Sequence, residues 1–454
     1  MGAGGAGMSA IAATLAAMGH QVSGSDLKEG RSLDRLRAAG VRVTVGHDAS
    51  NLPQDVALVA ISTAVPATNP EVVAATERGV PVVRRAQVLA GIAARRDTVA
   101  VAGTHGKTTT SSMLVLILVE AGLSPSFIVG GDLNEIGSGS AWDDGRFMVV
   151  EADESDGTFL ELPRTSALVT NVEPDHLEHH GSWEALQAAF VTFVADTPGP
   201  VVLCADDPVA AGLAEFAGGR ARTYGTGPGA DYQMVNVVSG RSGCSFELVH
   251  EGRSLGEVRL PVAGVHNARN AAGALVCAMA LGAPFSDGVS ALARFAGVAR
   301  RFEHRGEAGG IHFVDDYAHL PTEVTAAVAA AKDGSWDRVV CVFQPHRYSR
   351  TAALWQDFAD AFVDADVVAV TDVYASGEAP RPGVSGKLIV DAILSAHPRA
   401  RVAYLPGLND VVDWLGSELR PGDLCLTLGA GDLTTVPTRV LAALEGGTVG
   451  ETPP

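Results

Sequence analysis

A glycine-rich segment that also carries a lysine and two threonines lies at residues 103–109, where the chain reads GTHGKTT. It follows the β-branched run Thr98–Ala102 and precedes a long apolar stretch. A strand, a glycine turn and a helix in this order direct several backbone N–H groups at a polyphosphate. Lys107 would bring positive charge to the β- and γ-phosphates, and Thr108 a hydroxyl ligand for Mg²⁺. A plain glycine turn is the alternative, but it leaves the lysine and threonines unexplained. The segment therefore predicts an ATP site.

Acidic residues follow a second β-branched run. Glu151 stands at the end of Phe147–Val150 and opens the sequence EADESD. Mg²⁺ bound to ATP takes one or two further oxygen ligands, and the end of a strand is a usual place for one. We expect Glu151 to be that ligand, and Asp153 and Glu154 to belong to a solvated acidic turn. His176 lies shortly after a third run, and its position fits a metal ligand and a strand-end histidine equally well.

A second set of glycines lies at the start of the chain. Gly2, Gly4 and Gly7 fit the spacing G-x-G-x-x-G, and Asp26 follows about twenty residues later. This pattern is typical of a dinucleotide-binding turn, with the acidic residue on a ribose hydroxyl. Taken alone, it indicates an NAD-dependent oxidoreductase. A sugar nucleotide is equally compatible, because both ligands present a pyrophosphate to a helix N-terminus.

The elements that must position these groups alternate between strand and helix. Short β-branched runs end in Gly, Asp, Asn or Thr and precede stretches rich in Ala and Leu, which predicts parallel sheets with ligands at the carboxyl ends of strands. We expect three α/β domains: a Rossmann-like domain at 1–95, a P-loop ATPase-type domain at 96–304 and a Rossmann-like domain at 305–454. The expected strands include Thr98–Ala102, Phe147–Val150, Ala167–Thr170, Val339–Phe343, Val367–Thr371 and Leu424–Leu428.

Composition narrows the class of protein. The 454 residues carry a net charge of -19, which argues against a nucleic-acid partner. No secretory signal opens the chain, and the longest apolar stretch, Met113–Val119, is too short to span a bilayer. The five cysteines are widely spaced, without a Cys-x-x-Cys pair, so we expect free thiols in a cytoplasmic protein. They are Cys204, Cys244, Cys277, Cys341 and Cys425.

These motifs together resemble the Mur ligase family, the enzymes that build the peptide of bacterial cell-wall precursors. The phosphate loop is short, with Gly103 only three residues before Gly106, and this variant is the family's own. Residues 264–270 (GVHNARN) and 300–302 (RRF) resemble two further family segments. Other stretches resemble the branch that adds L-alanine to UDP-N-acetylmuramate: 2–9 (GAGGAGMS), 23–26 (SGSD), 151–156 (EADESD), 315–324 (DDYAHLPTEV) and 344–350 (QPHRYSR).

The resemblance implies an ATP-dependent ligase that joins L-alanine to UDP-N-acetylmuramate through an acyl phosphate, with ATP and Mg²⁺ as cofactors, as a monomer or homodimer. The implied ATP contacts are Gly103, Thr104, His105, Gly106, Lys107, Thr108, Thr109, Asn267, Asn270, Arg301 and Asp316. The implied contacts of the sugar nucleotide and L-alanine are Gly4, Gly5, Gly7, Ser9, Asp26, His47, Ser62, Arg85, Tyr317, His319, His346 and Arg350. The implied metal ligands are Thr108 and Glu151, with a second ion at His176, and the implied catalytic residues are Lys107, His346, Arg347 and Arg350.

The chemistry suits these residue types. Phosphoryl transfer depends on positioning and charge neutralisation, which Lys107 and metal ions provide. Arg347 or Arg350 can hold the amino-acid carboxylate through two hydrogen bonds. The alternative is that residues 344–350 form a basic surface turn, which would have the same sequence pattern. The incoming ammonium must lose a proton, and His346 or His319 is a candidate acceptor.

Three departures from the family pattern stand out. Leu320 takes the place of a second histidine, so the histidine pair of the family is incomplete at 319–320. No lysine occurs between Lys107 and Lys332, so the carbamylated lysine of several sister ligases has no counterpart. Relatives also carry an apolar strand ahead of the first glycine, whereas this sequence has only Met1 there. We therefore expect weak binding of UDP-N-acetylmuramate.

Other functions account for less of the sequence. A recycling ligase that adds a preformed peptide to the same nucleotide would not need the crowded Arg/His cluster at 344–350. An NAD-dependent oxidoreductase leaves the loop at 103–109 and Glu151 unexplained. A non-catalytic relative is disfavoured because the expected phosphate and metal residues are present.

Overall fold

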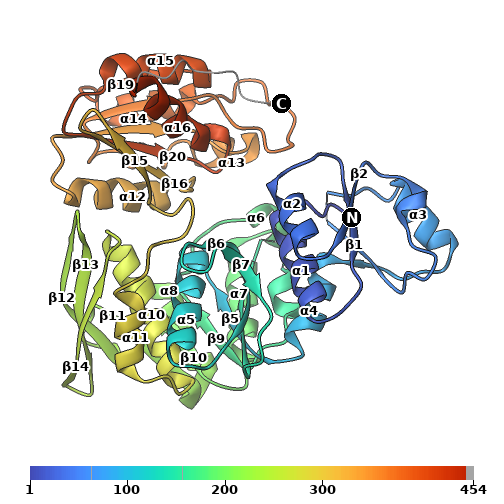
Figure 1. Ribbon diagram of the computed structural model, residues 1–454. Helices are drawn as coiled ribbons and strands as arrows, with labels where there is room; N and C mark the ends of the chain where they lie inside the picture. The colour runs from blue at the N-terminus through green and yellow to red at the C-terminus, as the bar shows by residue number, and fades with distance from the viewer. Residues whose placement is uncertain (63, 156, 446–454) are drawn as a thin grey trace. The chain divides into compact units, whose positions relative to one another are not determined.

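The computed structural model describes residues 1–62, 64–155 and 157–445. Backbone contacts divide the chain into two compact units (Figure 1). The first comprises residues 1–235, 247–258 and 269–295, and the second comprises residues 236–246, 259–268 and those from 296 onward. None of the helices in the described ranges has the length and apolar character that crossing a bilayer requires.

Two small parallel sheets open the first unit, β1 with β2 and β3 with β4. The first three residues join them, because the Ala3 N–H donates to the Ser25 carbonyl (3.0 Å) and the Met1 α-amino group donates to the Ala60 carbonyl (2.7 Å). A cavity of about 670 Å³ adjoins this segment. The elements are α1 (Ala6–Ala17), β1 (Ser23–Asp26), α2 (Arg31–Ala38), β2 (Arg42–Val45), η1 (Ala49–Asn51), β3 (Val59–Ile61), α3 (Pro70–Glu77), β4 (Val82–Arg84) and α4 (Arg85–Ala93).

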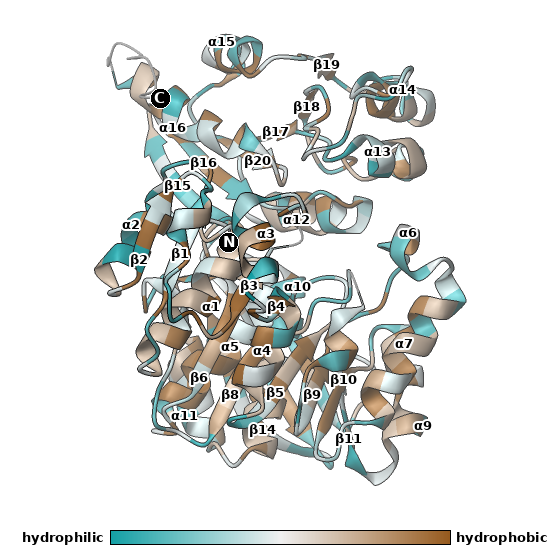
Figure 2. Ribbon diagram, turned by 90° about the vertical axis from the view of Figure 1, so that its right-hand side faces the viewer, coloured by the Kyte–Doolittle hydropathy of each residue, from teal (hydrophilic) through white to brown (hydrophobic). Residues whose placement is uncertain are grey.

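A ten-stranded sheet follows, in the order β14-β13-β12-β11-β10-β9-β5-β8-β6-β7. Its middle strand β5 (Asp97–Ala102) runs parallel to β8 and β9, and all three are apolar and almost fully buried, as expected of strands covered on both faces (Figure 2). The two units divide β12, β13 and β14 between them. The other strands are β6 (Ser126–Leu133), β7 (Ser138–Ala141), β8 (Phe147–Glu151), β9 (Ser166–Val169), β10 (Val201–Cys204), β11 (Ala221–Gly225), β12 (Tyr232–Gly240), β13 (Gly243–His250) and β14 (Arg253–Leu260).

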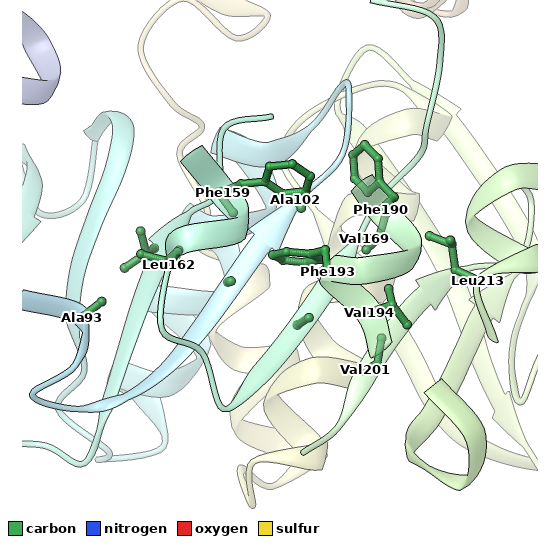
Figure 3. Close-up of a cluster of buried hydrophobic side chains, with 14 of the residues drawn as sticks. Ala93, Ala102, Phe159, Leu162, Val169, Phe190, Phe193, Val194, Val201 and Leu213 are labelled. Carbon is green, nitrogen blue, oxygen red and sulfur yellow. The ribbon is translucent and has the colours of Figure 1, made fainter. Parts of the chain in front are cut away.

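The helices of this region enclose that sheet. α5 (Lys107–Glu120) is buried around its circumference from Thr108 to Val115, where hydroxyl residues come first and apolar residues follow. Elsewhere the core is aromatic: the ring of Phe159 lies 5.3 Å from that of Phe190 and 5.1 Å from that of Phe193 (Figure 3). The remaining elements are η2 (Thr158–Glu161), α6 (Leu177–His180), α7 (Trp183–Ala195), α8 (Pro208–Gly212), α9 (Ala214–Ala217), η3 (Gly218–Arg220), α10 (Val265–Ala280) and α11 (Phe285–Leu292).

The second unit contains a six-stranded sheet in the order β15-β16-β20-β17-β18-β19, antiparallel only between β15 and β16. Alternate residues of β17 enter different core clusters, Cys341 and Phe343 in one and Val340 and Val342 in the other, so both faces are covered. Its elements are β15 (Glu303–Ala308), β16 (Ile311–Asp316), α12 (Pro321–Asp333), β17 (Arg338–Phe343), α13 (Tyr348–Leu354), β18 (Val367–Val370), α14 (Lys387–Ala396), β19 (Val402–Tyr404), α15 (Leu408–Glu418), β20 (Asp423–Leu428), η4 (Asp432–Thr435) and α16 (Val436–Leu444). The α/β class and the six strands expected from the sequence are confirmed.

Candidate active site

The loop between β5 and α5 has a backbone that only glycine accommodates at two positions. Gly103 and Gly106 have φ of +127° and +78°. A Cβ on Gly103 would overlap the Thr170 hydroxyl, and one on Gly106 would lie 2.5 Å from the Asn270 Oδ1. Asn171 fixes the loop between them, since its Oδ1 accepts from the His105 N–H at 2.8 Å. The loop is thus braced before any phosphate reaches it.

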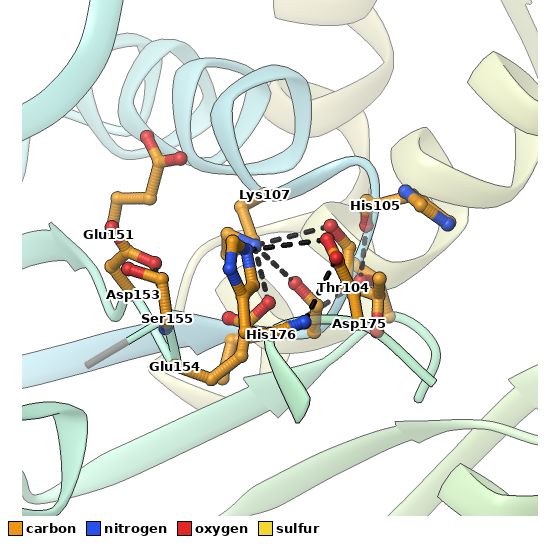
Figure 4. Close-up of polar contacts among 12 residues, drawn as sticks. Thr104, His105, Lys107, Glu151, Asp153, Glu154, Ser155, Asp175 and His176 are labelled. Atoms are coloured by element: carbon orange, nitrogen blue, oxygen red, sulfur yellow. Dashed lines mark hydrogen bonds and ion pairs between the residues drawn. The ribbon is translucent and has the colours of Figure 1, made fainter. Parts of the chain in front are cut away.

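Lys107, the first residue of α5, directs its ammonium group into this loop (Figure 4). Its Nζ donates to the carbonyls of Gly103 (2.6 Å) and Thr104 (3.2 Å) and to Glu154 Oε1 (3.0 Å). Burial acts to lower the pKa of Lys107, but the charges of Glu154 and two neighbouring carboxylates outweigh it and raise the pKa. The lysine is therefore charged and already fully hydrogen-bonded.

Glu154 differs from its sequence expectation. Its side chain is only 2% exposed and paired with Lys107, so the prediction of a solvated turn is wrong for this residue. Within the described chain its Oε2 is buried with no hydrogen-bond partner. Sequence inspection missed this role because the burial comes from the surrounding fold and not from the acidic run itself. Asp156, the last residue of that run, lies outside the described residues.

Thr108 and Glu151 meet at the carboxyl ends of the central strands. The Thr108 hydroxyl lies 2.9 and 3.1 Å from the two Glu151 carboxylate oxygens, and the Gly130 N–H donates to Oε2 at 2.6 Å. A hydroxyl and a carboxylate are ligands that Mg²⁺ takes when ATP supplies the remaining oxygens. The described residues contain no group of three or more His, Cys, Asp or Glu arranged for a metal.

His176 lies near the same acidic segment, in the left-handed backbone region with φ of +53°. Its Nε2 is 3.2 Å from Asp175 Oδ2. Burial acts to raise the pKa of Asp153, but Lys107, Ser155 and the His176 ring together lower it below its usual value. Asp153 therefore lies within the electrostatic reach of both Lys107 and His176.

A cavity of about 770 Å³ lies at the first glycine loop, and Gly4, Gly5, Asp26, His47 and Ser62 all line it. In this cavity the Gly4 N–H donates to Asp26 Oδ2 at 2.7 Å. A backbone donor of a helix N-terminus and an acidic residue therefore face the same space, as a sugar nucleotide would require.

Three other predicted contacts of the first unit lie elsewhere. Ser9 bonds its own helix through the Ala6 carbonyl. Arg85 packs over Gly7, where a Cβ would lie 2.6 Å from its Nη1, and it lines a separate small cavity with Glu151. Ser9, Gly7 and Arg85 thus do not line the larger cavity.

Asp316 and the paired arginines form one part of the second unit. Burial raises the pKa of Asp316 to about 6, against the opposing charge of Arg301. The Asp316 carboxylate accepts the N–H groups of Phe302 and Ala318, both at 2.7 Å. The Arg301 guanidinium lies 5.0 Å from the centre of the Tyr317 ring.

Asn267 is also in this unit, where its amide donates to the Ala263 carbonyl at 2.7 Å, whereas Asn270 is in the first unit.

His346 lies at the centre of a second group. Its ring is 5.6 Å from that of His319 and its Nδ1 is 3.2 Å from Arg350 Nη1. Burial, followed by the charges of His319 and the two nearby arginines, lowers the pKa of His346 to about 3. A guanidinium only donates, so Nδ1 accepts and the neutral ring carries its proton on Nε2. His346 is therefore neutral at ordinary pH.

Two neighbours of this group are unusual. Arg347 adopts φ of +68°, a strained conformation for a residue with a side chain, and its N–H donates to the Tyr374 carbonyl at 2.8 Å. Leu320 is 5% exposed and directly precedes α12. A histidine in its place would bring a polar ring into a buried position.

Three family models match the chain one after another. The model described as "Mur ligase family, catalytic domain" matches residues 1–97, "Mur ligase middle domain" residues 101–278, and "Mur ligase, glutamate ligase domain" residues 300–431. Among similar proteins, the UDP-N-acetylmuramate–L-alanine ligase of Acidothermus cellulolyticus is 48% identical, over 98% of this chain and 94% of that protein.

Solved structures agree with these matches. The UDP-N-acetylmuramate–alanine ligase MurC of Thermotoga maritima superposes with a TM-score of 0.83 at 30% identity, covering 98% of both chains. A murein peptide ligase from Psychrobacter arcticus gives a TM-score of 0.71 at 24% identity, covering 98% of this chain and 97% of its own, which is a likeness of fold.

Proposed function

This chain belongs to the Mur ligase family, and on that premise we propose that it is an ATP-dependent ligase that joins L-alanine to UDP-N-acetylmuramate. The observation that carries the proposal is the 48% identity, over 98% of the chain, to the UDP-N-acetylmuramate–L-alanine ligase of Acidothermus cellulolyticus. The recycling ligase is not favoured, because the similarity to the murein peptide ligase is a likeness of fold. An oxidoreductase is not favoured either, because it would not explain the phosphate-binding loop.

The reaction would take place in two steps. The γ-phosphoryl group of ATP is transferred to the muramate carboxylate, which gives an acyl phosphate and ADP. The L-alanine nitrogen then bonds to the acyl carbon while the carbon–oxygen bond to phosphate breaks, and the nitrogen loses its extra protons. Phosphate and an amide are the products.

Lys107 and the braced loop would bind the ATP phosphates. Three backbone and side-chain acceptors hold the Lys107 ammonium in place, so it need exchange only one of them for a phosphate oxygen. Pre-positioned charge of this kind is the main contribution a protein makes to phosphoryl transfer. Arg301 and Asp316 are proposed contacts of the nucleotide in the second unit.

Thr108 and Glu151 fit a Mg²⁺ ion, since they place one hydroxyl and one carboxylate side by side. When bound, the ion would neutralise negative charge on the phosphates. The protein orients the Glu151 carboxylate through the Gly130 N–H, which donates to its Oε2. His176 remains the proposed contact of a second ion.

Arg347 and Arg350 are the proposed ligands of the L-alanine carboxylate. A pKa of about 3 makes His346 a poor proton acceptor, so we assign it to orienting Arg350. His319 is the proposed acceptor of the ammonium proton, because it belongs to the same group: its Nδ1 donates to the Tyr317 carbonyl at 3.0 Å and its ring lies 5.6 Å from that of His346.

Coupled product release tests the proposal. Phosphate release by the full chain should require ATP, Mg²⁺, UDP-N-acetylmuramate and L-alanine together, with glycine and L-serine as competing amines. Faster coupling of a tripeptide than of L-alanine would establish the recycling activity instead. NAD binding without ATP turnover would overturn both.

We place the reaction in the cytoplasm, where ATP is available and where five free, buried thiols would stay reduced.

A further inference from the structure

Glu71 is a buried carboxylate outside the residues considered so far. It is the second residue of α3 and only 3% exposed. A carboxylate is rarely buried to this extent unless donors surround it. Its position in the first turn of α3 also places it at the positive end of the helix dipole.

Four donors from other elements converge on this carboxylate. They are the Ser25 hydroxyl at 2.7 Å, the Asn51 amide at 2.8 Å, the His47 Nδ1 at 3.2 Å and the Asp48 N–H at 3.3 Å. Ser25 belongs to β1 and Asn51 to η1, so Glu71 connects three segments that are far apart in the sequence.

The network also fixes which nitrogen of His47 carries a proton. Its Nδ1 lies 3.1 Å from the Ser25 hydroxyl oxygen and 3.2 Å from Glu71 Oε1. The carboxylate can only accept, and Ser25 has already donated its proton to Glu71 Oε2. Whichever neighbour it uses, Nδ1 must therefore be the donor. The lone pair of the neutral ring is then on Nε2.

His47 also lines the sugar-nucleotide cavity. It borders this space of about 770 Å³ together with Gly4, Asp26 and Ser62. Because Nδ1 faces the buried carboxylate, Nε2 is the nitrogen left for a ligand. When the ring is neutral, Nε2 offers an acceptor and selects a ligand that presents an N–H or O–H group.

We propose that Glu71 is a positioning residue that holds His47 so that its Nε2 accepts a hydrogen bond from the nucleoside part of the bound UDP-sugar. The inference rests on the proposed function. Two groups of that nucleoside have the required chemistry, the imide N–H of uracil and a hydroxyl of ribose. Phosphate, by contrast, presents acceptors and would need a protonated ring.

Glu71→Gln tests the proposal, because glutamine has the same shape but replaces one acceptor oxygen with a donor. Binding of UDP to the full chain, measured by calorimetry, should weaken about tenfold, while binding of Mg²⁺ and ATP stays unchanged. KM for UDP-N-acetylmuramate should rise and kcat change little. Glu77→Gln is the matched control, since Glu77 is an exposed glutamate of the same helix.

A second readout separates positioning from a structural effect. Ring ¹⁵N shifts of His47 should report a proton on Nδ1 in the parent protein and a mixture of tautomers in Glu71→Gln. Adding Glu71→Gln to His47→Ala should weaken UDP binding no further than His47→Ala does alone. Additive losses, or an unchanged tautomer, would overturn the proposal.

The parent protein provides a test that needs no variant. N3-methyl-UDP lacks the imide donor, and 2′-deoxy-UDP and 3′-deoxy-UDP each lack one ribose hydroxyl, so weaker binding of one of them identifies the group that His47 contacts. If all three bind as UDP does, the proposal is wrong. If UDP itself does not bind, the sugar-nucleotide part of the proposed function fails instead, and the two failures are thus distinguishable.

Discussion

Replacing Lys107 by methionine should lower stability and abolish ligation for separate reasons. Methionine keeps most of the length of the side chain but removes the charge that Glu154 pairs with at 3.0 Å. Since Glu154 is 2% exposed and its Oε2 already has no partner in the described chain, neither carboxylate oxygen would then have one. Removing one member of a buried pair costs roughly 3–5 kcal/mol.

A loss of this size should lower the thermal midpoint of the nucleotide-free protein by on the order of 10 °C, measured by circular dichroism. Burial raises the pKa of Glu154, and without Lys107 the main opposing effect is lost. A carboxyl whose folded pKa is raised is most stabilising when protonated, so the deficit should grow as the pH rises above the ordinary carboxyl pKa.

The double variant Lys107→Met/Glu154→Gln separates the two effects. It removes the orphaned charge and should recover most of the thermal midpoint. Phosphate release should nevertheless remain absent, because the cation that binds the phosphates is still missing. An unchanged midpoint in Lys107→Met would refute the buried pair, and renewed ligation in the double variant would refute the assigned role of Lys107.

Two further predictions concern other parts of the molecule. Glu151→Gln should reduce kcat on the order of 100-fold and raise the Mg²⁺ concentration needed for half-maximal phosphate release, with UDP binding unaffected; an unchanged Mg²⁺ titration would contradict its role as a ligand. Because His346 has a lowered pKa of about 3, its unfolded form binds more protons between about pH 6.5 and 3, so stability should fall on the order of 1–2 kcal/mol as the pH decreases through that window. Urea midpoints of His346→Gln should lack this part of the pH dependence.

The sequence alone determined the strands, the phosphate loop and one pairing at the site. Val/Ala-rich runs identified β5, β8 and β9 because strands buried on both faces need apolar residues at every position. The rule that parallel strands end at one edge of a sheet then placed Glu151 beside Thr108, and the two lie 2.9 Å apart. Glycine at 103 and 106 followed from the backbone that the loop requires.

The tertiary structure alone decided which polar groups are buried and what they face. Glu154 reads as one acid in an acidic run, yet the fold encloses it against Lys107, 47 residues away. Glu71 and Ser25 are 46 residues apart, and no local periodicity links them. The pKa of His346 likewise depends on desolvation by segments distant in the chain. Hydrophobic pattern and backbone geometry are local properties that a sequence displays directly, whereas burial and charge neighbours exist only once distant segments have packed together.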